Sequence, residues 1–280
     1  MNKSVLLGAV MALGMAATTS GASTLEEVKA RGTLSCGTST GVAGFSLPDA
    51  NNVYQGFDVA VCRAVAAAVL GDPMAVEFVP TTGKTRFTAL ASGEVDMLSR
   101  TTTWTFSRDV DLKLDFHGVN YYDGQGFMVP KSLGVTSAKD LDGATVCIQV
   151  GTTTELNLAD FFRVNGITYE PVPTEKSSES RALYQAEACD VYTTDASGLA
   201  SARSTFADPS AHVILPEIVS KEPLGPVTRH GDNQWGDIVR WTLNALISAE
   251  ELGITKANVA EMAAAPTNNP EINRMMGTEG

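Results

Sequence analysis

The sequence predicts an α/β protein made of two lobes that are connected by two crossings of the chain. Strand-like and helix-like segments alternate along the chain, and this alternation starts afresh near residue 145. Two extended segments that contain glycine, at 121–129 and 222–228, follow the first and the second series. Such alternation is typical of βαβ units. We therefore expect each lobe to hold a mixed, mostly parallel sheet that is flanked by helices.

Each expected element follows from its local pattern. Short apolar runs predict strands, whereas the segment 57–70 carries Val59, Cys62, Val65 and Val69 at helical spacing. In the first series we expect strands at 33–37, 76–79 and 95–99, and helices at 57–70 and 85–91. In the second series we expect strands at 145–150, 168–172 and 190–194, and helices at 153–164 and 178–186. A long amphipathic helix is expected at 234–252.

The first 22 residues read as a secretory signal peptide that is cleaved after Ala22. Lys3 gives a basic start, residues 5–17 are apolar, and small residues precede the cleavage point. The apolar stretch is shorter than the roughly 20 residues that span a bilayer. We assign residues 23–126 and 229–280 to lobe 1 and residues 127–228 to lobe 2. Hinge segments are expected near 127–131 and 222–229.

The composition describes an exported globular protein with an acidic surface. Hydrophobic residues make up 44% of the chain, which is enough for a sizeable core in each lobe. The formal net charge of −12 argues against nucleic acid and anionic membranes as partners. It does not argue against a small ligand, because a pocket can be basic within an acidic protein.

Four cysteines in an exported chain predict two disulfides. They allow three pairings, and we favour Cys36–Cys62 with Cys147–Cys189 because each pair then stays within one half of the chain. A zinc site is the competing interpretation. No two cysteines have CxxC spacing and the three histidines are scattered, so no metal is expected.

The run 99–109, SRTTTWTFSRD, predicts a carboxylate-binding site just past a strand. Thr101 and Thr103 offer hydroxyl and backbone N–H groups, and the planar fork of Arg108 matches a carboxylate bidentately. A solvated Ser/Thr-rich loop is the alternative. The roles of Arg100 and Trp104 stay open, with Arg100 either reaching an acidic ligand side chain or bracing the loop.

Two further polar positions follow strands in the second half. Thr153 lies where the run 151–155, GTTTE, opens a helix, and the free N–H groups of a helix start attract an anion. Asp195 is expected just past a strand end, where ligands bind in open α/β sheets, and a carboxylate there suits an ammonium group. Plain helix capping is the alternative for both. Together with Arg108, these positions fit a ligand that carries a carboxylate and an ammonium group, an α-amino acid.

The motifs of common enzymes are missing from the sequence. GxGxxG, GxxxxGK[ST], HExxH and GxSxG do not occur, and no histidine lies beside a serine or cysteine in a nucleophile pattern. We expect no catalytic residues and no cofactor, so the pattern favours a binding protein over an enzyme.

Several long segments resemble family 3 of the solute-binding proteins of ABC transporters, and within it the branch that binds L-amino acids generally. The resemblance covers most of the chain from 23 onward, with its most specific motifs in 56–59 (GFDV), 95–109, 120–127 (NYYDGQGF), 142–162 and 189–201. It implies a two-lobe type II periplasmic-binding-protein fold. In the family's roles, Arg108 grips the α-carboxylate, Thr101, Thr103 and Thr153 support it, Asp195 holds the α-ammonium group, and Phe45 lies over the side-chain pocket.

The resemblance also implies what the protein does. We expect a monomeric periplasmic receptor that closes its lobes on a free L-amino acid and delivers it to permease subunits in the inner membrane. Members of this branch continue beyond the position of Gly280, so we expect a shortened version of the family pattern. The alternatives are a dehydratase or lyase of the same fold, acting on a prephenate-like acid, and a sensory module, which would need an attached kinase or membrane segment.

Overall fold

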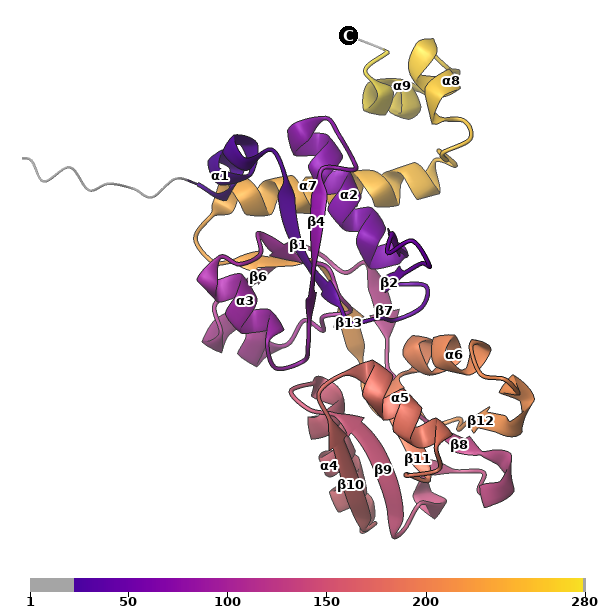
Figure 1. The fold of residues 1–280 in the computed structure, drawn as a ribbon. Coiled ribbons are helices and arrows are strands. Elements are labelled where there is room, and N and C mark those ends of the chain that lie inside the picture. Colours follow the sequence, from indigo (N-terminus) through magenta and orange to yellow (C-terminus); the bar gives the residue numbers. More distant parts are fainter. Residues whose placement is uncertain (1–22, 279–280) are drawn as a thin grey trace, which may run out of the picture.

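The computed structural model describes residues 23–278, which form two lobes, each built on a five-stranded sheet (Figure 1). The expected signal peptide lies outside the described residues. Helices flank both sheets, so the α/β, two-lobe class predicted from the sequence is confirmed. Each sheet contains two parallel and two antiparallel strand pairs, a smaller parallel share than we expected.

The first sheet has the strand order β4-β1-β5-β14-β6. Strand β1 (Leu34–Ser39) runs parallel to β4 (Val76–Thr81) and β5 (Met97–Leu98), while β14 (Val227–Arg229) runs antiparallel to β5 and β6 (Leu114–Phe116). Its helices are α1 (Thr24–Arg31), α2 (Phe57–Leu70), α3 (Arg86–Ser92) and α7 (Asn233–Glu251). Smaller elements are β2 (Leu47–Pro48), β3 (Tyr54–Gln55), a π-helix η1 (Ser107–Asp111), α8 (Val259–Ala264) and α9 (Pro270–Met276).

The second sheet has the strand order β10-β9-β11-β8-β12. Strand β9 (Ala144–Gln149) runs parallel to β10 (Tyr169–Thr174) and β11 (Val191–Asp195), while β8 (Gln125–Pro130) runs antiparallel to β11 and β12 (His212–Ile214). Its α-helices are α4 (Thr153–Asn165), α5 (Ser177–Gln185) and α6 (Ala196–Ser204). Three single turns of 3-10 helix complete it, at Lys131–Leu133, Ala138–Asp140 and Pro209–Ala211.

Two short strands connect the lobes as an antiparallel ribbon. Strand β7 (Tyr121–Asp123) pairs with β13 (Glu222–Leu224), and Figure 1 shows both between the two sheets. Strand β8 already belongs to the second sheet, so the first crossing lies a few residues before the 127–131 segment that the sequence suggested. We infer that β7 and β13 are the hinge segments, because they belong to neither five-stranded sheet.

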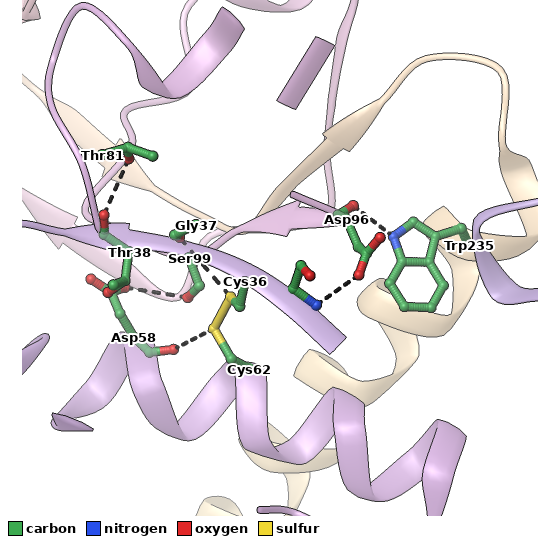
Figure 2. The surroundings of a disulfide bond; sticks show 10 residues. Cys36, Gly37, Thr38, Asp58, Cys62, Thr81, Asp96, Ser99 and Trp235 are labelled. Atoms are coloured by element: carbon green, nitrogen blue, oxygen red, sulfur yellow. Dashed lines mark hydrogen bonds between the residues drawn. A yellow bond between two sulfur atoms is a disulfide. The ribbon is translucent and has the colours of Figure 1, made fainter. Parts of the chain in front are cut away.

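A disulfide fastens helix α2 to the centre of the first sheet. Cys36 of β1 is bonded to Cys62 of α2, and Figure 2 shows Asp58 one turn earlier on the same helix, facing Ser99. The second disulfide joins Cys147 of β9 to Cys189, just before β11. These are the two pairings that the sequence analysis favoured. Each disulfide therefore strengthens one lobe internally.

The hydrophobic cores lie between each sheet and its helices. In the first lobe, fully buried Trp235 of α7 packs among Val28, Leu34 and Val65, and its indole N–H donates to the Asp96 carbonyl oxygen at 3.0 Å (Figure 2). In the second lobe, a separate cluster surrounds Phe162. Four helices, α1, α6, α8 and α9, had no counterpart among the expected elements. Within residues 23–278, no helix is both long and apolar enough to cross a lipid bilayer.

Gly56 is held in a backbone conformation that only glycine adopts readily. It precedes α2 with φ +124° and ψ −178°, and a Cβ there would overlap the carbonyl oxygen of Phe45. We expect Gly56→Ala to lower the free energy of unfolding by about 1–3 kcal/mol or more, measured by denaturant unfolding. Gly32→Ala is the matched control, because Gly32 also has positive φ but open space around it, and its cost should stay near ~1 kcal/mol. If both substitutions lowered the free energy of unfolding equally, the overlap with the Phe45 carbonyl oxygen would have to be removed by a local shift of the backbone.

Candidate functional site

The loop that follows β5 carries the residues expected to bind a carboxylate. Thr102 and Thr103 are buried, and Thr101 has φ +49°, a left-handed conformation that β-branched residues rarely adopt. Strain of this kind is concentrated at ligand sites, because the surrounding structure must impose it. Thr101 lines two small cavities between the lobes, as the sequence suggested for a residue past a strand end.

Arg108 enters this region from the π-helix η1. Its side chain is buried, Nη1 donates to the carbonyl oxygen of Thr103 at 2.8 Å, and the guanidinium lies 5.2 Å from the centre of the Phe87 ring. Burial lowers the pKa of Arg108 to about 10, while Glu222 and Asp195 partly restore it. The group stays charged at neutral pH, as a carboxylate clamp requires.

Two more buried arginines lie close to Arg108. Arg86 begins α3 and Arg100 follows β5, and both line the same interlobe cavity. Burial and repulsion from other guanidinium groups lower the pKa of both, that of Arg100 to about 10. Among residues 23–278 none of the three arginines forms an ion pair, and the Nε atoms of Arg86 and Arg100 have no hydrogen-bond partner. The first lobe thus presents three unpaired cations to the site.

Arg86 was missed as a site residue in the sequence analysis. The signal was present, because it lies at the start of a helix that follows a strand of the first sheet, at the same edge as Thr101. Arg100 was left between two roles, and its burial beside Asp58 is compatible with both. Burial raises the pKa of Asp58 to about 6, and Arg100 is the main group that opposes this rise.

The second lobe contributes the start of α4 and the end of β11. Thr152 is the N-cap of α4, accepting from the Glu155 N–H at 3.2 Å, so Thr153 is the first helical residue and its hydroxyl is free for other contacts. Asp195 ends β11 next to α6, yet its side chain makes no capping hydrogen bond there. The capping alternative therefore applies to Thr152 and not to Asp195.

Asp195 is a carboxyl group in an unfavourable environment. Burial first, and then the nearby carboxylates of Asp123 and Glu222, raise its pKa from 3.8 to about 7, although Arg86 and Arg108 oppose the rise. A cationic group placed against Asp195 would restore its charge, since an opposite charge favours ionisation. The site therefore offers a place for an ammonium ion.

The two interlobe cavities meet at Asp195. Each has a volume of about 40 Å³, and Thr101, Thr194 and Asp195 line both. One cavity continues to Arg86, Arg100, Thr103 and Thr153, and the other to Arg181 and Ser201 on the second lobe. The lobes touch around them, since Arg86 Nη2 donates to the Gly151 carbonyl oxygen at 3.4 Å and Ser201 Oγ to that of Ala43 at 2.8 Å.

Glu222 is a second residue that the sequence analysis did not single out. It lies on the hinge strand β13 with 1% of its surface exposed. Its carboxylate accepts from Thr103 Oγ1 at 2.5 Å and from Thr153 Oγ1 at 3.0 Å, so it joins the loop of one lobe to the helix of the other. No local pattern in the sequence marks it, because its partners are distant along the chain.

Phe45 and Trp104 are held by contacts outside the two interlobe cavities. Phe45 packs edge-to-face against Phe57 and Tyr121, and it lines neither interlobe cavity. Trp104 stacks on Phe116 at 5.5 Å, and its Nε1 donates to Asp109 at 2.6 Å. The contacts of Trp104 stabilise the loop that carries Arg108. Within residues 23–278 no cluster of three or more potential metal ligands is found.

Comparison with known proteins links this geometry to a family. The profile of the bacterial extracellular solute-binding proteins, family 3, matches residues 34–257. The glutamate/glutamine/aspartate/asparagine-binding protein BztA of Rhodobacter capsulatus is 66% identical over 280 residues, 100% of this chain and 82% of that protein. The general L-amino acid-binding periplasmic protein AapJ of Rhizobium johnstonii is 58% identical, over 97% of this chain and 78% of that protein.

A solved structure gives the same result. The ABC transporter periplasmic binding protein from Brucella ovis, with glutathione bound, is 55% identical and superposes with a TM-score of 0.88, covering 93% of this chain and 81% of that one. These relatives are named as binding proteins and not as enzymes, in agreement with the expectation from the sequence. The matches extend over most of the described residues. The chain therefore belongs to the bacterial extracellular solute-binding proteins, family 3.

Proposed function

We propose that this protein is an extracytoplasmic receptor that binds a free L-amino acid with an acidic or amide side chain between its lobes and delivers it to an ABC-transporter permease. The α-carboxylate would bind Arg108, with Thr101, Thr103 and Thr153 around it, and the α-ammonium group would bind Asp195. Because such a ligand would contact both lobes, it would bind the closed conformation more tightly than the open one. Ligand binding would therefore favour lobe closure.

One observation carries the proposal. Two buried guanidinium groups, of Arg86 and Arg100, line one cavity together with Asp195, and the buried guanidinium of Arg108 lies close to them. None of the three forms an ion pair with a described residue. An α-carboxylate needs only one of these arginines. A second oxygen-rich group on the ligand would match the remaining two, since buried charges are stable only when they are paired.

The names of the relatives support this choice of ligand. The relative from Rhodobacter capsulatus is named for glutamate, glutamine, aspartate and asparagine, all of which carry a side-chain carboxylate or amide. The relative from Brucella ovis was solved with glutathione, whose glutamyl end keeps a free α-amino acid group. The second cavity, which leads from Asp195 toward Arg181, offers a direction for a longer ligand of that type.

The cellular setting is part of the proposal. The segment 1–22 would direct export and be removed after Ala22, leaving a monomer in the periplasm that docks on permease subunits of the inner membrane. Phe45 would act indirectly, by fixing the aromatic cluster beside the cavity.

A thermal-shift screen of the mature protein against the twenty amino acids tests the proposal. We expect L-glutamate, L-glutamine, L-aspartate and L-asparagine to raise the melting temperature most, because a ligand at 100 times its Kd stabilises the native state by about 2.7 kcal/mol. D-glutamate is the matched control, since its ammonium and carboxylate groups cannot meet Asp195 and Arg108 together with the same side-chain placement. A screen in which no amino acid raises the melting temperature would contradict the proposal.

A prephenate-like acid belongs in the same screen. The raised pKa of Asp195 is the kind of property that a dehydratase would need in a general acid. Turnover of that acid, followed by absorbance, would support the enzyme alternative, whereas binding of amino acids without turnover supports a receptor.

A further inference from the structure

Arg181 is a further arginine at the lobe interface, and it comes from the second lobe. It lies on α5, where it is half-buried, and it lines the cavity that it shares with Asp195 and Ser177. Residues 41 and 42 of the first lobe line the same cavity. Among the described residues around this cavity, Arg181 is the single cation. The second cavity therefore has a guanidinium of its own, distinct from those of the first lobe.

The guanidinium of Arg181 has no acceptor among the described residues. Within residues 23–278 it forms neither an ion pair nor a hydrogen bond, although Asp195 lines the same cavity. Its charge acts on Tyr192, where burial raises the pKa of the hydroxyl to about 12 and Arg181 opposes the rise. All five N–H groups of Arg181 are therefore left for a ligand.

Two serine hydroxyls of this cavity are already engaged as donors. The hydroxyl of Ser197 donates to Asp123, and Ser201 Oγ donates to the carbonyl oxygen of Ala43 at 2.8 Å. The strongest donor that remains is the guanidinium of Arg181. Its planar fork matches a carboxylate with two parallel hydrogen bonds. The second cavity therefore favours a ligand that carries a carboxylate at its far end.

We propose that Arg181 binds the terminal carboxylate of a γ-glutamyl peptide, and that the second cavity is the subsite for the residue after the glutamyl group. This inference rests on the proposed function and extends its ligand class. The α-groups of the glutamyl part would keep their places at Arg108 and Asp195, and its γ-carbonyl oxygen would accept from Arg100. Both cavities have Thr194 in their walls, so the next residue of the peptide would continue past Thr194 into the second cavity. Free glutamate or glutamine ends before this subsite.

Titration calorimetry with γ-L-glutamylglycine and its C-terminal amide tests the proposal through the ratio Kd(amide)/Kd(acid). The two peptides differ only in the charged end group. We expect a ratio of about tenfold or more in the wild type, falling to about one in Arg181→Gln, because a charge-assisted pair with the carboxylate is lost.

Arg203→Gln is the matched control for this experiment. Arg203 lies on α6 in the same lobe and is half-buried like Arg181, but it lines neither interlobe cavity. Its ratio should stay within about twofold of the wild-type ratio. Arg181→Lys is a second variant that keeps a cation at the position without the planar fork. We expect its ratio to lie between those of the wild type and Arg181→Gln.

The outcomes distinguish the two levels of inference. A ratio near one in the wild type, or the wild-type ratio in Arg181→Gln, would overturn the role of Arg181. Binding of L-glutamine without binding of γ-L-glutamylglycine would overturn the subsite and leave the proposed function intact. A wild-type protein that binds neither would overturn the proposed function and this inference with it. Circular dichroism of each variant confirms that a change in the ratio belongs to a folded protein.

Discussion

Affinity for L-glutamate is expected to fall by about two to four orders of magnitude when Arg108 is replaced by alanine. The guanidinium is buried and, among residues 23–278, has only the Thr103 carbonyl oxygen as a close acceptor, so the ligand carboxylate would lose its main partner in a buried site. Removing one member of a buried charge pair costs about 3–5 kcal/mol. Titration calorimetry gives the loss directly.

A surface arginine provides the control for this experiment. Arg163 on α4 is exposed and pairs with Asp160 three residues earlier, so Arg163→Ala should change neither affinity nor fold measurably. Near-normal glutamate affinity in Arg108→Ala would show that the carboxylate binds elsewhere, most simply at Arg86 or Arg100.

Asp195→Asn is expected to weaken amino-acid binding and at the same time stabilise the ligand-free protein at pH 8. Binding should weaken by about ten- to a hundredfold, because the ligand ammonium group loses a charged partner. Stability should rise because an amide carries no charge to bury beside Asp123 and Glu222. A single substitution would thus lower the affinity for the ligand and raise the stability of the ligand-free protein.

The pH dependence of wild type follows from the same group. The pKa of Asp195 is about 7 in the folded protein and near 3.8 when unfolded, so the folded state binds more protons between about pH 4 and 7. The contribution of Asp195 to the free energy of unfolding is therefore lost as the pH rises from about 4 to 7. In Asp195→Asn this part of the pH dependence of stability should be absent. Ligand affinity has the opposite trend, because only the ionised carboxylate holds an ammonium group, and it should rise toward pH 8.

Denaturant unfolding at pH 5 and pH 8, without ligand, measures both effects. Asp142→Asn is the control, since Asp142 is exposed and its pKa is lowered by hydrogen bonds from Thr168. A lower stability of Asp195→Asn than of wild type at pH 8 would contradict the prediction, as would wild-type ligand affinity in that variant.

The parts of the site that could be predicted are those that follow strands. Thr101 and Asp195 were placed by a rule of α/β folds, that polar residues past the carboxyl ends of strands converge. The structure brings both to the same cavities. Their roles toward a ligand are predictions that the variants above test. Helix α1 could have been predicted too, because Ser23 and Glu26 form a capping box that is readable in the sequence.

The parts that could not be predicted depend on long-range packing. The hydrogen-bond partners of Glu222, which include Thr103, Thr153 and Asn157, lie 65 to 119 residues away along the chain. The place of Arg86 at a helix start is readable from the sequence, but its hydrogen bond to the Gly151 carbonyl oxygen of the second lobe, 65 residues away along the chain, is not. Phe45 was placed by a loose match of sequence, and no local pattern could show that its ring would turn toward Phe57 and Tyr121.

The ribbon of β7 and β13 connects the two lobes and also carries charged groups that act on the site. Asp123 and Glu222 lie opposite each other in this ribbon, and both raise the pKa of Asp195. Asp123 also accepts from Ser197 at the start of α6. Bending of this ribbon would therefore change the distances from the Asp123 and Glu222 carboxylates to that of Asp195. We therefore expect the pKa of Asp195 to change when the lobes move relative to each other.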